Sequence, residues 1–339
     1  MAVEKVVEFL RAKWFSIGLL GISVVTLTES GRFLSDLGMW FKAHHGAEAV
    51  IVIIFFLSGL IVKTEQIKTG LSDIRGTALA LFIIFVIAPL TAWCLGLIPL
   101  SPGIRIGLFL VAVMPTTLSS GVVMTGASGG NTAHALLITI LANGLAVFTI
   151  PISLTLLLKE GGNWTEVSIN GPKMMIQIGT LVLVPLFLGL LTRFVKKGKW
   201  TMQEKYLPTV NQCMILFIVW IALSEARAVV VGSGGQIFTI IMVVFVFHGI
   251  LLVAGFATSG LFKMGPGRRE SVIFMGGQKT LPLSVLLQVT LFPQYGLALI
   301  FCVVHHLVHL IMDGYLVGRL AQSREGRRLE EEARGAESL

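Results

Sequence analysis

The chain has 339 residues, of which 55% are hydrophobic and only 13% are charged, and this balance excludes an ordinary soluble domain. Its formal net charge of +8 comes from basic residues that lie between apolar stretches, without the interleaved aromatic residues of a nucleic-acid-binding surface. Because the apolar stretches are long and lack the alternation of strands, they predict an all-α membrane protein.

Few residues suggest catalysis or metal binding. Cys94, Cys213 and Cys302 lie in apolar stretches without pairing or metal spacing, so neither a disulfide framework nor a zinc site is expected. The sequence contains no phosphate-binding loop, no HExxH motif and no mid-membrane pair of aspartates, so we expect no enzyme. Since the first residues lack a cleavable signal pattern, the first span is expected to remain as a signal anchor.

Ten apolar segments predict ten transmembrane helices. The first five lie near residues 14–28, 48–62, 76–98, 103–125 and 132–158, and a polar and aromatic link is expected between the first two. The second five lie near residues 173–195, 206–226, 236–262, 270–291 and 294–321. The predicted units are a cytoplasmic N-terminal segment (1–13), a first five-span repeat (14–158), an extracytoplasmic loop (159–172), a second five-span repeat (173–321) and a charged cytoplasmic tail (322–339).

The basic residues predict how the chain is oriented. If the N-terminus lies inside, 19 of the 26 lysines and arginines fall in inner segments and 6 fall in outer loops, while Lys279 lies within a span. Lysine and arginine are enriched in the cytoplasmic loops of membrane proteins. Both termini are therefore predicted to be cytoplasmic.

The fourth and ninth spans are each interrupted in the middle. In the ninth span, two glycines and Pro282 flank the polar run Gln278, Lys279 and Thr280, and in the fourth span Pro115 begins a similar run. Glycine loosens a helix and proline removes an amide donor. Burying a lysine near mid-membrane costs roughly 2.5–3.5 kcal/mol on insertion scales, so its presence indicates a functional site.

The two halves of the chain repeat one another. Setting residues 114–125 over residues 277–288 aligns the two interruptions. Because five spans is an odd number, the second half enters the membrane from the opposite side to the first. The predicted architecture is therefore two inverted five-helix repeats whose broken helices, four and nine, cross near the centre.

Hydroxyl groups in the first interruption predict a binding site. Thr116, Thr117, Ser119 and Ser120 supply hydroxyls, and main-chain carbonyls freed by the break suit a hard cation such as Na⁺. The alternative is a kinked helix whose serines and threonines bond only to their own backbone. The matching interruption in the other half favours the binding site.

Further polar residues lie beside the two interruptions. Thr139 and Asn143 are four residues apart and share one face of the fifth span, where they complete a polar cage or make an ordinary interhelical hydrogen bond. Gln278 can donate to an anion and accept from a cation, whereas Lys279 can only donate. Lys279 either favours an anionic solute, takes the place of a cation, or pairs with a buried acid, for which Asp313 is the evident candidate.

The last span carries a line of histidines. The spacing of His305, His309 and Asp313 puts them on one face, with His306 beside them. A proton relay or gate, a transition-metal site and plain buried hydrogen bonding all remain open from the spacing. His134 and His248 stand alone in the sequence and are expected to be structural.

The segments 115–131 and 274–284, together with the repeat, resemble the bile acid:sodium symporter family, in the branch similar to solute carrier family 10 member 7. The resemblance implies a panel domain of spans one, two, six and seven, and a core domain of the other six. The ion-binding residues that it implies are Ser120, Thr139 and Gln278. The residues that we predict to bind the solute are Thr116, Thr117, Ser119, Asn143, Gln278, Lys279 and Thr280.

The chain departs from the family pattern at two positions that matter for a cation. Phe274 stands where the family has a glutamate, and Lys279 stands where it has an asparagine. A cation site depends on charge balance, so losing the acid and gaining an ammonium should weaken Na⁺ binding. The residues therefore leave open Na⁺-independent or proton-coupled transport in which Lys279 replaces a cation.

These features predict a secondary active transporter in the cell (inner) membrane that carries a small organic anion by alternating access. Sodium symport is what the resemblance implies, with Na⁺ as the one cofactor expected and the lipid bilayer as a partner. From a different class, the chain would be a membrane sensor or regulator of ion (calcium) homeostasis that binds a ligand without transporting it.

Overall fold

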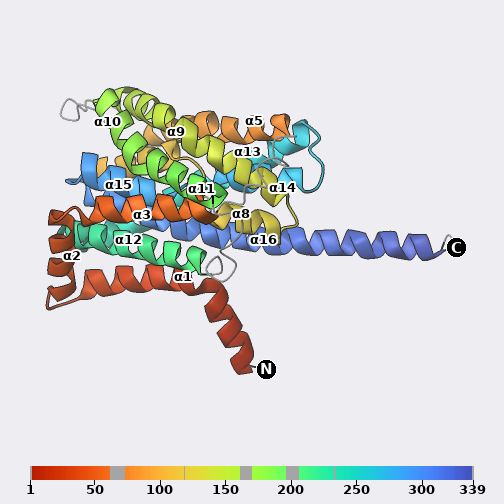
Figure 1. Cartoon of the computed structure of the whole chain (residues 1–339), viewed down its shortest axis with the longest axis horizontal. Helices are drawn as coiled ribbons and strands as arrows, with labels where there is room; N and C mark the ends of the chain where they lie inside the picture. Colours follow the sequence, from red (N-terminus) through yellow and green to blue (C-terminus); the bar gives the residue numbers. More distant parts are fainter. Residues whose placement is uncertain are drawn as a thin grey trace.

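The computed structural model describes residues 2–61, 73–117, 119–160, 170–195, 206–232 and 234–337. These residues form helices and short connections, without strands, so the predicted all-α class is confirmed. Most helices run along one direction, α2 crosses one end of the bundle, and α16 extends beyond the other end (Figure 1). By length and apolar composition, seven described helices could cross a membrane, or eight if residues 14–28 and α2, which meet at 105°, form one span.

The helices of the first half cover each predicted span. They are α1 (Ala2–Thr28), α2 (Phe33–Ala43), α3 (Gly46–Ile61), α5 (Ile74–Phe82), the π-helix η1 (Ile83–Ile87), α6 (Ala88–Gly96), α7 (Pro102–Val113), α8 (Ser119–Ala127) and α9 (Thr132–Glu160). Three of them, α5, η1 and α6, form one continuous span. Proline at the first turn begins α7, where its missing amide proton is not needed.

The helices of the second half follow the same pattern. They are α10 (Gly171–Ile178), the π-helix η2 (Gly179–Leu183), α11 (Val184–Val195), α12 (Leu207–Val231), the short 3₁₀ helix η3 (Gly234–Gln236), α13 (Ile237–Leu261), α14 (Arg268–Gly277), α15 (Leu281–Leu291) and α16 (Gly296–Glu337). Most of the predicted extracytoplasmic loop, residues 161–169, lies outside the described residues.

The expected link between the first two spans is wrong in one respect, because it contains the helix α2. Arg32 takes a left-handed backbone conformation, which turns the chain, and the Glu29 carboxylate accepts hydrogen bonds from the first amides of α2. An ion pair between Lys42 and Glu225 and a hydrogen bond from Arg227 to the Glu29 carbonyl then hold this region against α12. Capping by Glu29 and the contacts with α12 thus stabilise a helix, α2, in the segment whose composition indicated a polar link.

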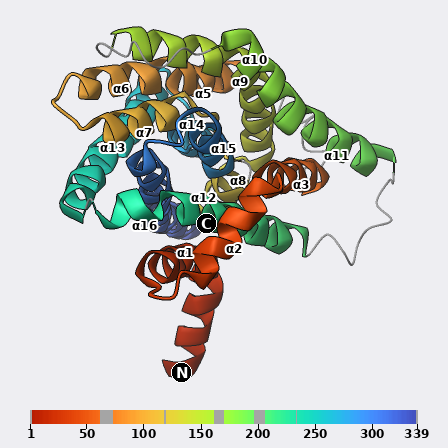
Figure 2. The same ribbon diagram turned by 90° about the vertical axis from the view of Figure 1, so that its left-hand side faces the viewer.

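The helices gather in two groups. In one group α3 packs against α11 and α12, while α1 and α2 pack against α12. In the other, α14 contacts α5, α8, α9 and α13, and α16 contacts α7, α13 and α15. The end view shows α14 and α15 at the centre of the second group (Figure 2), and their span is wholly buried.

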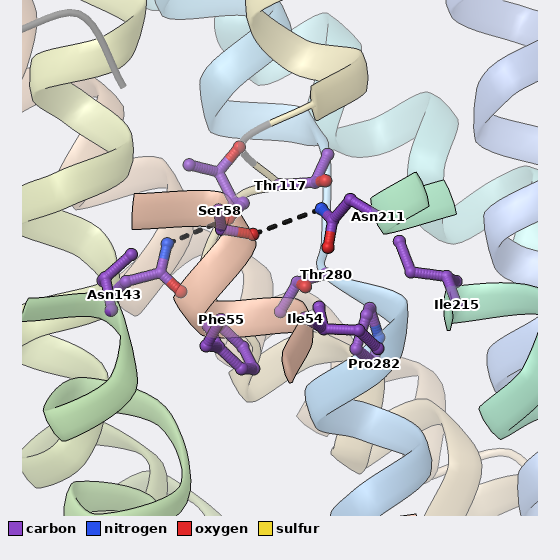
Figure 3. Close-up of a pocket in the computed structure, with 11 residues that line it drawn as sticks. Ile54, Phe55, Ser58, Thr117, Asn143, Asn211, Ile215, Thr280 and Pro282 are labelled. Carbon is purple, nitrogen blue, oxygen red and sulfur yellow. Dashed lines mark hydrogen bonds between the residues drawn. The ribbon is translucent and has the colours of Figure 1, made fainter. Parts of the chain in front are cut away.

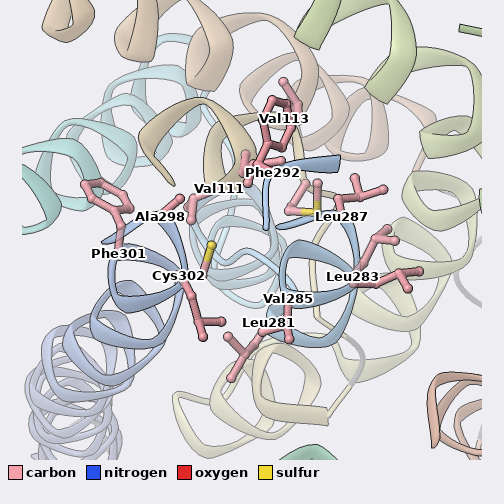
Figure 4. Close-up of a cluster of buried hydrophobic side chains, with 14 of the residues drawn as sticks. Val111, Val113, Leu281, Leu283, Val285, Leu287, Phe292, Ala298, Phe301 and Cys302 are labelled. Atoms are coloured by element: carbon pink, nitrogen blue, oxygen red, sulfur yellow. The ribbon is translucent and has the colours of Figure 1, made fainter. Parts of the chain in front are cut away.

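Apolar side chains fill the space around α15. Figure 4 shows three side chains of α15, those of Leu283, Val285 and Leu287, packed near Val111 of α7 and Phe301 of α16. All five side chains are at most 2% exposed. Burying such side chains stabilises the protein by roughly 1.5–3 kcal/mol each in water. In a membrane the comparable stabilisation comes from close packing, so this cluster fixes the position of α15 and of the break before it.

Two glycines bring α3 and α11 into backbone contact. A Cβ atom added to Gly189 would lie 2.2 Å from the carbonyl oxygen of Phe56, and one added to Gly59 would lie 2.3 Å from that of Leu186. These distances are far below normal contact, and the atoms met are backbone atoms that cannot swing away. Glycine at both positions therefore lets the two helices approach closely.

Replacing Gly189 by alanine is expected to force α3 and α11 apart and to lower the free energy of unfolding by about 1–3 kcal/mol. Thermal unfolding of the purified protein in detergent measures the change. The matched control is Gly144→Ala, because a Cβ atom at Gly144 meets nothing within 4 Å. Equal melting temperatures for the two variants would contradict the close contact.

Candidate functional site

Both predicted interruptions are present, and they touch. The chain leaves the helix between Val113 and Ser119 in the fourth predicted span, and between Gly277 and Leu281 in the ninth. The amide of Thr280 donates a hydrogen bond of 3.0 Å to the carbonyl of Pro115. A main-chain bond between two unwound segments is possible because each break frees backbone groups from its own helix. The two broken helices therefore meet inside the bundle.

Lys279 caps three carbonyls in the interior. Its ammonium donates to the carbonyl oxygens of Ile84 at 3.0 Å, Ala112 at 3.1 Å and Met114 at 3.0 Å, and the side chain is 2% exposed. Ala112 and Met114 belong to the end of α7, where carbonyls lack helical partners, and Ile84 lies in the π-helix η1. All three ammonium protons thus have acceptors, and Asp313 is not the partner of Lys279.

Gln278 joins the second break to two other helices. Its side-chain oxygen accepts from the Ser120 hydroxyl at 2.9 Å, and its nitrogen donates to the Asp313 carboxylate at 2.8 Å. The hydroxyl of Thr139, which we also predicted to bind an ion, donates to the carbonyl of Ala135 in its own helix. The structure thus brings Ser120 and Gln278 into direct contact, while Thr139 makes a bond within α9.

A pocket opens beside the two breaks, between the two groups of helices (Figure 3). Its polar side chains are Ser58 of α3, Thr116 and Thr117 of the first break, Asn143 of α9, Asn211 of α12 and Thr280 of the second break. Its cavity volume is about 30 Å³, well below the roughly 300–1,000 Å³ found for small-molecule pockets, so in this conformation it has room for little more than water. The polar lining, rather than the size, is what suits a solute.

Hydrogen bonds hold two of these amides in place. Asn143 donates to the carbonyls of Thr139 at 2.9 Å and Thr116 at 3.3 Å, and Asn211 donates to the Ser58 hydroxyl at 3.3 Å. The Thr116 hydroxyl and the Asn211 side-chain oxygen are buried without a protein partner. Buried polar atoms are normally paired, so these two are available to a solute or to water.

The predicted solute-binding residues divide between the pocket and its supports. Four of them, Thr116, Thr117, Asn143 and Thr280, line the pocket. Gln278 and Lys279 do not line it and instead bond to the protein, and the side chain of Ser119 lies outside the described part of the structure.

Sequence reasoning missed Ser58 and Asn211. Both are polar residues inside apolar spans, at positions 58 and 211, and such residues are uncommon enough in transmembrane helices to have indicated a site. The span of each was predicted, but nothing in the sequence placed the two spans next to the breaks. They supply the face of the pocket opposite the broken helices.

The histidines of α16 lie together with Asp313, and His248 of α13 joins them. His248 lies 2.8 Å from one Asp313 oxygen, and His309 lies 3.7 Å from the other. His309 is also 2.9 Å from His306. His248, which stands alone in the sequence, thus has an acidic partner in the fold. Among the described residues, no group of three or more histidine, cysteine, aspartate or glutamate side chains could hold a metal ion.

His134 also has partners, near the start of α5 and α14. Its ring nitrogens lie 2.6 Å from the Ser271 hydroxyl and 3.2 Å from the Thr77 hydroxyl. Asp73 accepts from the Arg268 guanidinium and from the amide of Gly76, which caps α5. Burial alone would raise the pKa of Asp73, but the hydrogen bonds from Arg268 and Gly76 and nearby positive charge lower it below its ordinary value of 3.8.

A lowered pKa makes the stability from Asp73 depend on pH. The contribution is present above the ordinary pKa of 3.8 and is lost as the pH falls through the lower folded value. At about pH 6, Asp73→Asn should therefore melt below the wild type, with the difference shrinking below pH 3.8. Because Arg268 is 44% exposed, screening keeps the effect small. A difference in melting temperature that stayed constant with pH would contradict this assignment.

The sequence matches the family described as SBF-like CPA transporter family (DUF4137) over residues 13–322. It is 29% identical to "Probable sodium/metabolite cotransporter BASS4, chloroplastic" of Arabidopsis thaliana, and 32% identical to the protein of the same name in Oryza sativa subsp. indica. Each match covers 78% of this chain, and the chain spans less than two thirds of the length of these relatives, 63% and 66%. It is 25% identical to "Sodium/bile acid cotransporter 7-B" of Xenopus laevis, over 91% of this chain and 92% of the relative.

Proposed function

The chain belongs to the SBF-like CPA transporter family, and from this premise we propose that it carries a small organic anion across a membrane by alternating access. Family membership and the apolar helices make it a multi-pass membrane transporter rather than an enzyme, and the predicted membership of the bile acid:sodium symporter family is confirmed. The nature of the solute, the coupling ion and the alternating-access mechanism are what we propose.

The position of two half-helices at the pocket carries the proposal of an anion. Thr280 immediately precedes α15, Thr117 lies just before α8, and both residues line the pocket. The N-terminus of a helix carries partial positive charge and unpaired amides, which favour an anionic group. Lys279 adds a full positive charge behind the second break without occupying the pocket.

The proposed ligands follow from this arrangement. Thr116, Thr117, Asn143 and Thr280 contact the solute from the broken-helix side, with Ser119 as a further ligand. Ser58 and Asn211 contact it from the other side. Lys279 acts on the solute indirectly, by holding the carbonyls at the first break and by its positive charge. Gln278 acts indirectly through its hydrogen bonds to Ser120 and Asp313. Relatives are named as cotransporters of bile acids and of metabolites, so solutes of both classes should be tested.

Sodium is the first candidate for the coupling ion, because the relatives are named sodium cotransporters. Ser120, Thr139 and Gln278 are its proposed ligands. A second candidate has support from one contact set: Lys279 places its side-chain ammonium on three carbonyls, the kind of ligand that a sodium ion takes. With the ammonium there, transport would not need Na⁺.

The membrane arrangement is part of the proposal. Ten spans follow if α1 with α2, α3, and α7 with α8 each count as one span beside the seven long apolar helices. The helix group of α1, α3, α10–α11 and α12 is then the panel, and the other helices form the core. The two halves are inverted repeats, the membrane is the cell (inner) membrane, and both termini lie in the cytoplasm, as the basic residues predict.

Uptake into proteoliposomes tests the proposal. The full chain is reconstituted, and a panel of labelled mono- and dicarboxylates and bile acids is offered with and without a Na⁺ gradient. We expect saturable uptake of at least one anion by the wild type and a large loss in Asn211→Leu. Binding without flux for every anion would make the protein a sensor instead. A strict requirement for Na⁺ would remove Lys279 as the replacement cation.

A further inference from the structure

A group of ionisable side chains lies buried beside the second break, away from the pocket. It consists of His248 on α13 and His306, His309 and Asp313 on α16, each at most 5% exposed. Its centre is the Asp313 carboxylate, whose oxygens lie 2.8 Å from His248 Nε2 and 3.7 Å from His309 Nδ1. No step of the proposed solute binding uses this group.

The charge of Asp313 needs a partner. Among the described residues, the two groups within ion-pair distance of Asp313 are both histidines, which can be neutral or charged. A buried carboxylate without a cation is costly, and a proton on an adjacent imidazole turns the contact into an ion pair. One proton taken from water would therefore change the charge of this group without any other ligand.

The remaining charged and titratable neighbours come from the elements packed around α16. From the second break, Gln278 donates to Asp313, and the next residue, Lys279, turns its ammonium toward three main-chain carbonyls. The ring of His305 lies 5.7 Å from that of His248 and 5.4 Å from that of His309. Lys279 opposes protonation and Asp313 favours it, so the proton belongs on the histidines that contact the carboxylate.

Two ring nitrogens of this group, Nδ1 of His248 and Nδ1 of His309, are buried without a hydrogen-bond partner among the described residues, and so is Nε2 of the neighbouring His305. Buried polar atoms without partners are uncommon in folded proteins and need a physical reason. A site that gains and loses a proton supplies one, because an unpartnered ring nitrogen is where the added proton or a water that delivers it can bind.

We propose that Asp313, His248 and His309 form a proton-binding site whose occupancy is transmitted to the broken helices through Gln278. In this step one proton passes from a hydronium ion to a histidine ring nitrogen, so that an O–H bond of hydronium breaks, an N–H bond forms and neutral water is left. Gln278 carries the effect because it bonds to Asp313 on one side and to Ser120 of α8 on the other. Only one part of the inference rests on the proposed function, namely that the bound proton acts as a coupling ion for transport.

The same group also touches the other set of helices. His309 lies 2.9 Å from His306, whose ring packs edge to face on Phe15 of α1 at 5.7 Å. Phe15 belongs to the helix group of α1, α3 and α12, which faces the pocket from the opposite side. A change of charge at Asp313 would therefore alter contacts both at the second break and between the two helix groups.

Nuclear magnetic resonance of the histidine rings tests the site without a solute. The full chain, with labelled histidine, is placed in lipid nanodiscs and titrated between about pH 5 and pH 8. We expect the histidines that contact Asp313 to take up one proton per protein within this range. Signals that stay neutral over the whole range would overturn the proposal, and the result does not depend on whether an anion is transported.

Two variants test the link to the break. Gln278→Leu removes a donor to Asp313 and should move the midpoint of proton binding at this site by at least about half a pH unit. The matched control is Gln288→Leu, because Gln288 is also buried but bonds to the carbonyls of Phe292 and Tyr295. The control should leave the midpoint unchanged. Equal midpoints in wild type and Gln278→Leu would overturn the transmission through Gln278.

Discussion

Lys279→Met is expected to lower the stability of the protein by roughly 2 kcal/mol or more. Methionine cannot donate, so the carbonyls of Ile84, Ala112 and Met114 lose their shared partner in the interior. A hydrogen bond to a charged group contributes about 1.5–3 kcal/mol, and three of them outweigh the roughly 2.5–3.5 kcal/mol that burying a lysine costs. Thermal unfolding of the purified protein measures the loss.

The matched control for Lys279 is Lys173→Met, because Lys173 is an exposed lysine at the start of α10. This variant should melt close to the wild type. A Lys279→Met protein with unchanged melting temperature would show that the ammonium does not hold the two helices together.

Ser58→Leu is expected to reduce anion flux at least tenfold. Ser58 lines the pocket from α3, opposite the broken helices, so a leucine side chain would occupy the space of the solute. A tenfold loss of flux corresponds to about 1.4 kcal/mol of lost binding free energy. Losing a major binding contact costs about 2 kcal/mol or more, so a tenfold loss is a lower bound. Uptake into proteoliposomes, with the anion identified from the panel, measures the effect.

Ser58→Ala separates volume from hydrogen bonding at the same position. Alanine removes the acceptor for Asn211, a bond of 3.3 Å, but leaves the pocket open. We expect it to keep flux within about fivefold of the wild type, since a neutral hydrogen bond contributes about 1 kcal/mol or less here. Unimpaired flux in Ser58→Leu would place the solute elsewhere in the protein.

Much of the helical arrangement was predictable because its causes are local. Proline at 115 and 282 and glycine at 276 and 277 dictate where helices cannot continue, and long apolar runs dictate where they can. The predicted breaks are therefore found in the structure at the expected places. The helix α2 escaped prediction because it depends on a turn at Arg32 and a pairing with α12, about 180 residues away.

The partners of the site residues were much less predictable. The carbonyl of Ile84 is available to Lys279 because η1 is a π-helix. This π-helical turn was not predicted from the sequence. His248 meets Asp313 only because α13 packs against α16. Residue type and depth indicated that these side chains matter, but contacts between spans distant in sequence determined what each one does.

One labelling measurement tests the central claim that the pocket at the crossed breaks opens in turn to either side of the membrane. The variant Thr117→Cys carries a single thiol in the pocket once Cys94, Cys213 and Cys302 are replaced. Oriented vesicles are treated with a membrane-impermeant thiol reagent, applied to one side or the other. Alternating access predicts labelling of this cysteine from both sides. Labelling from one side only, under every condition of pH and added anion, would contradict the account.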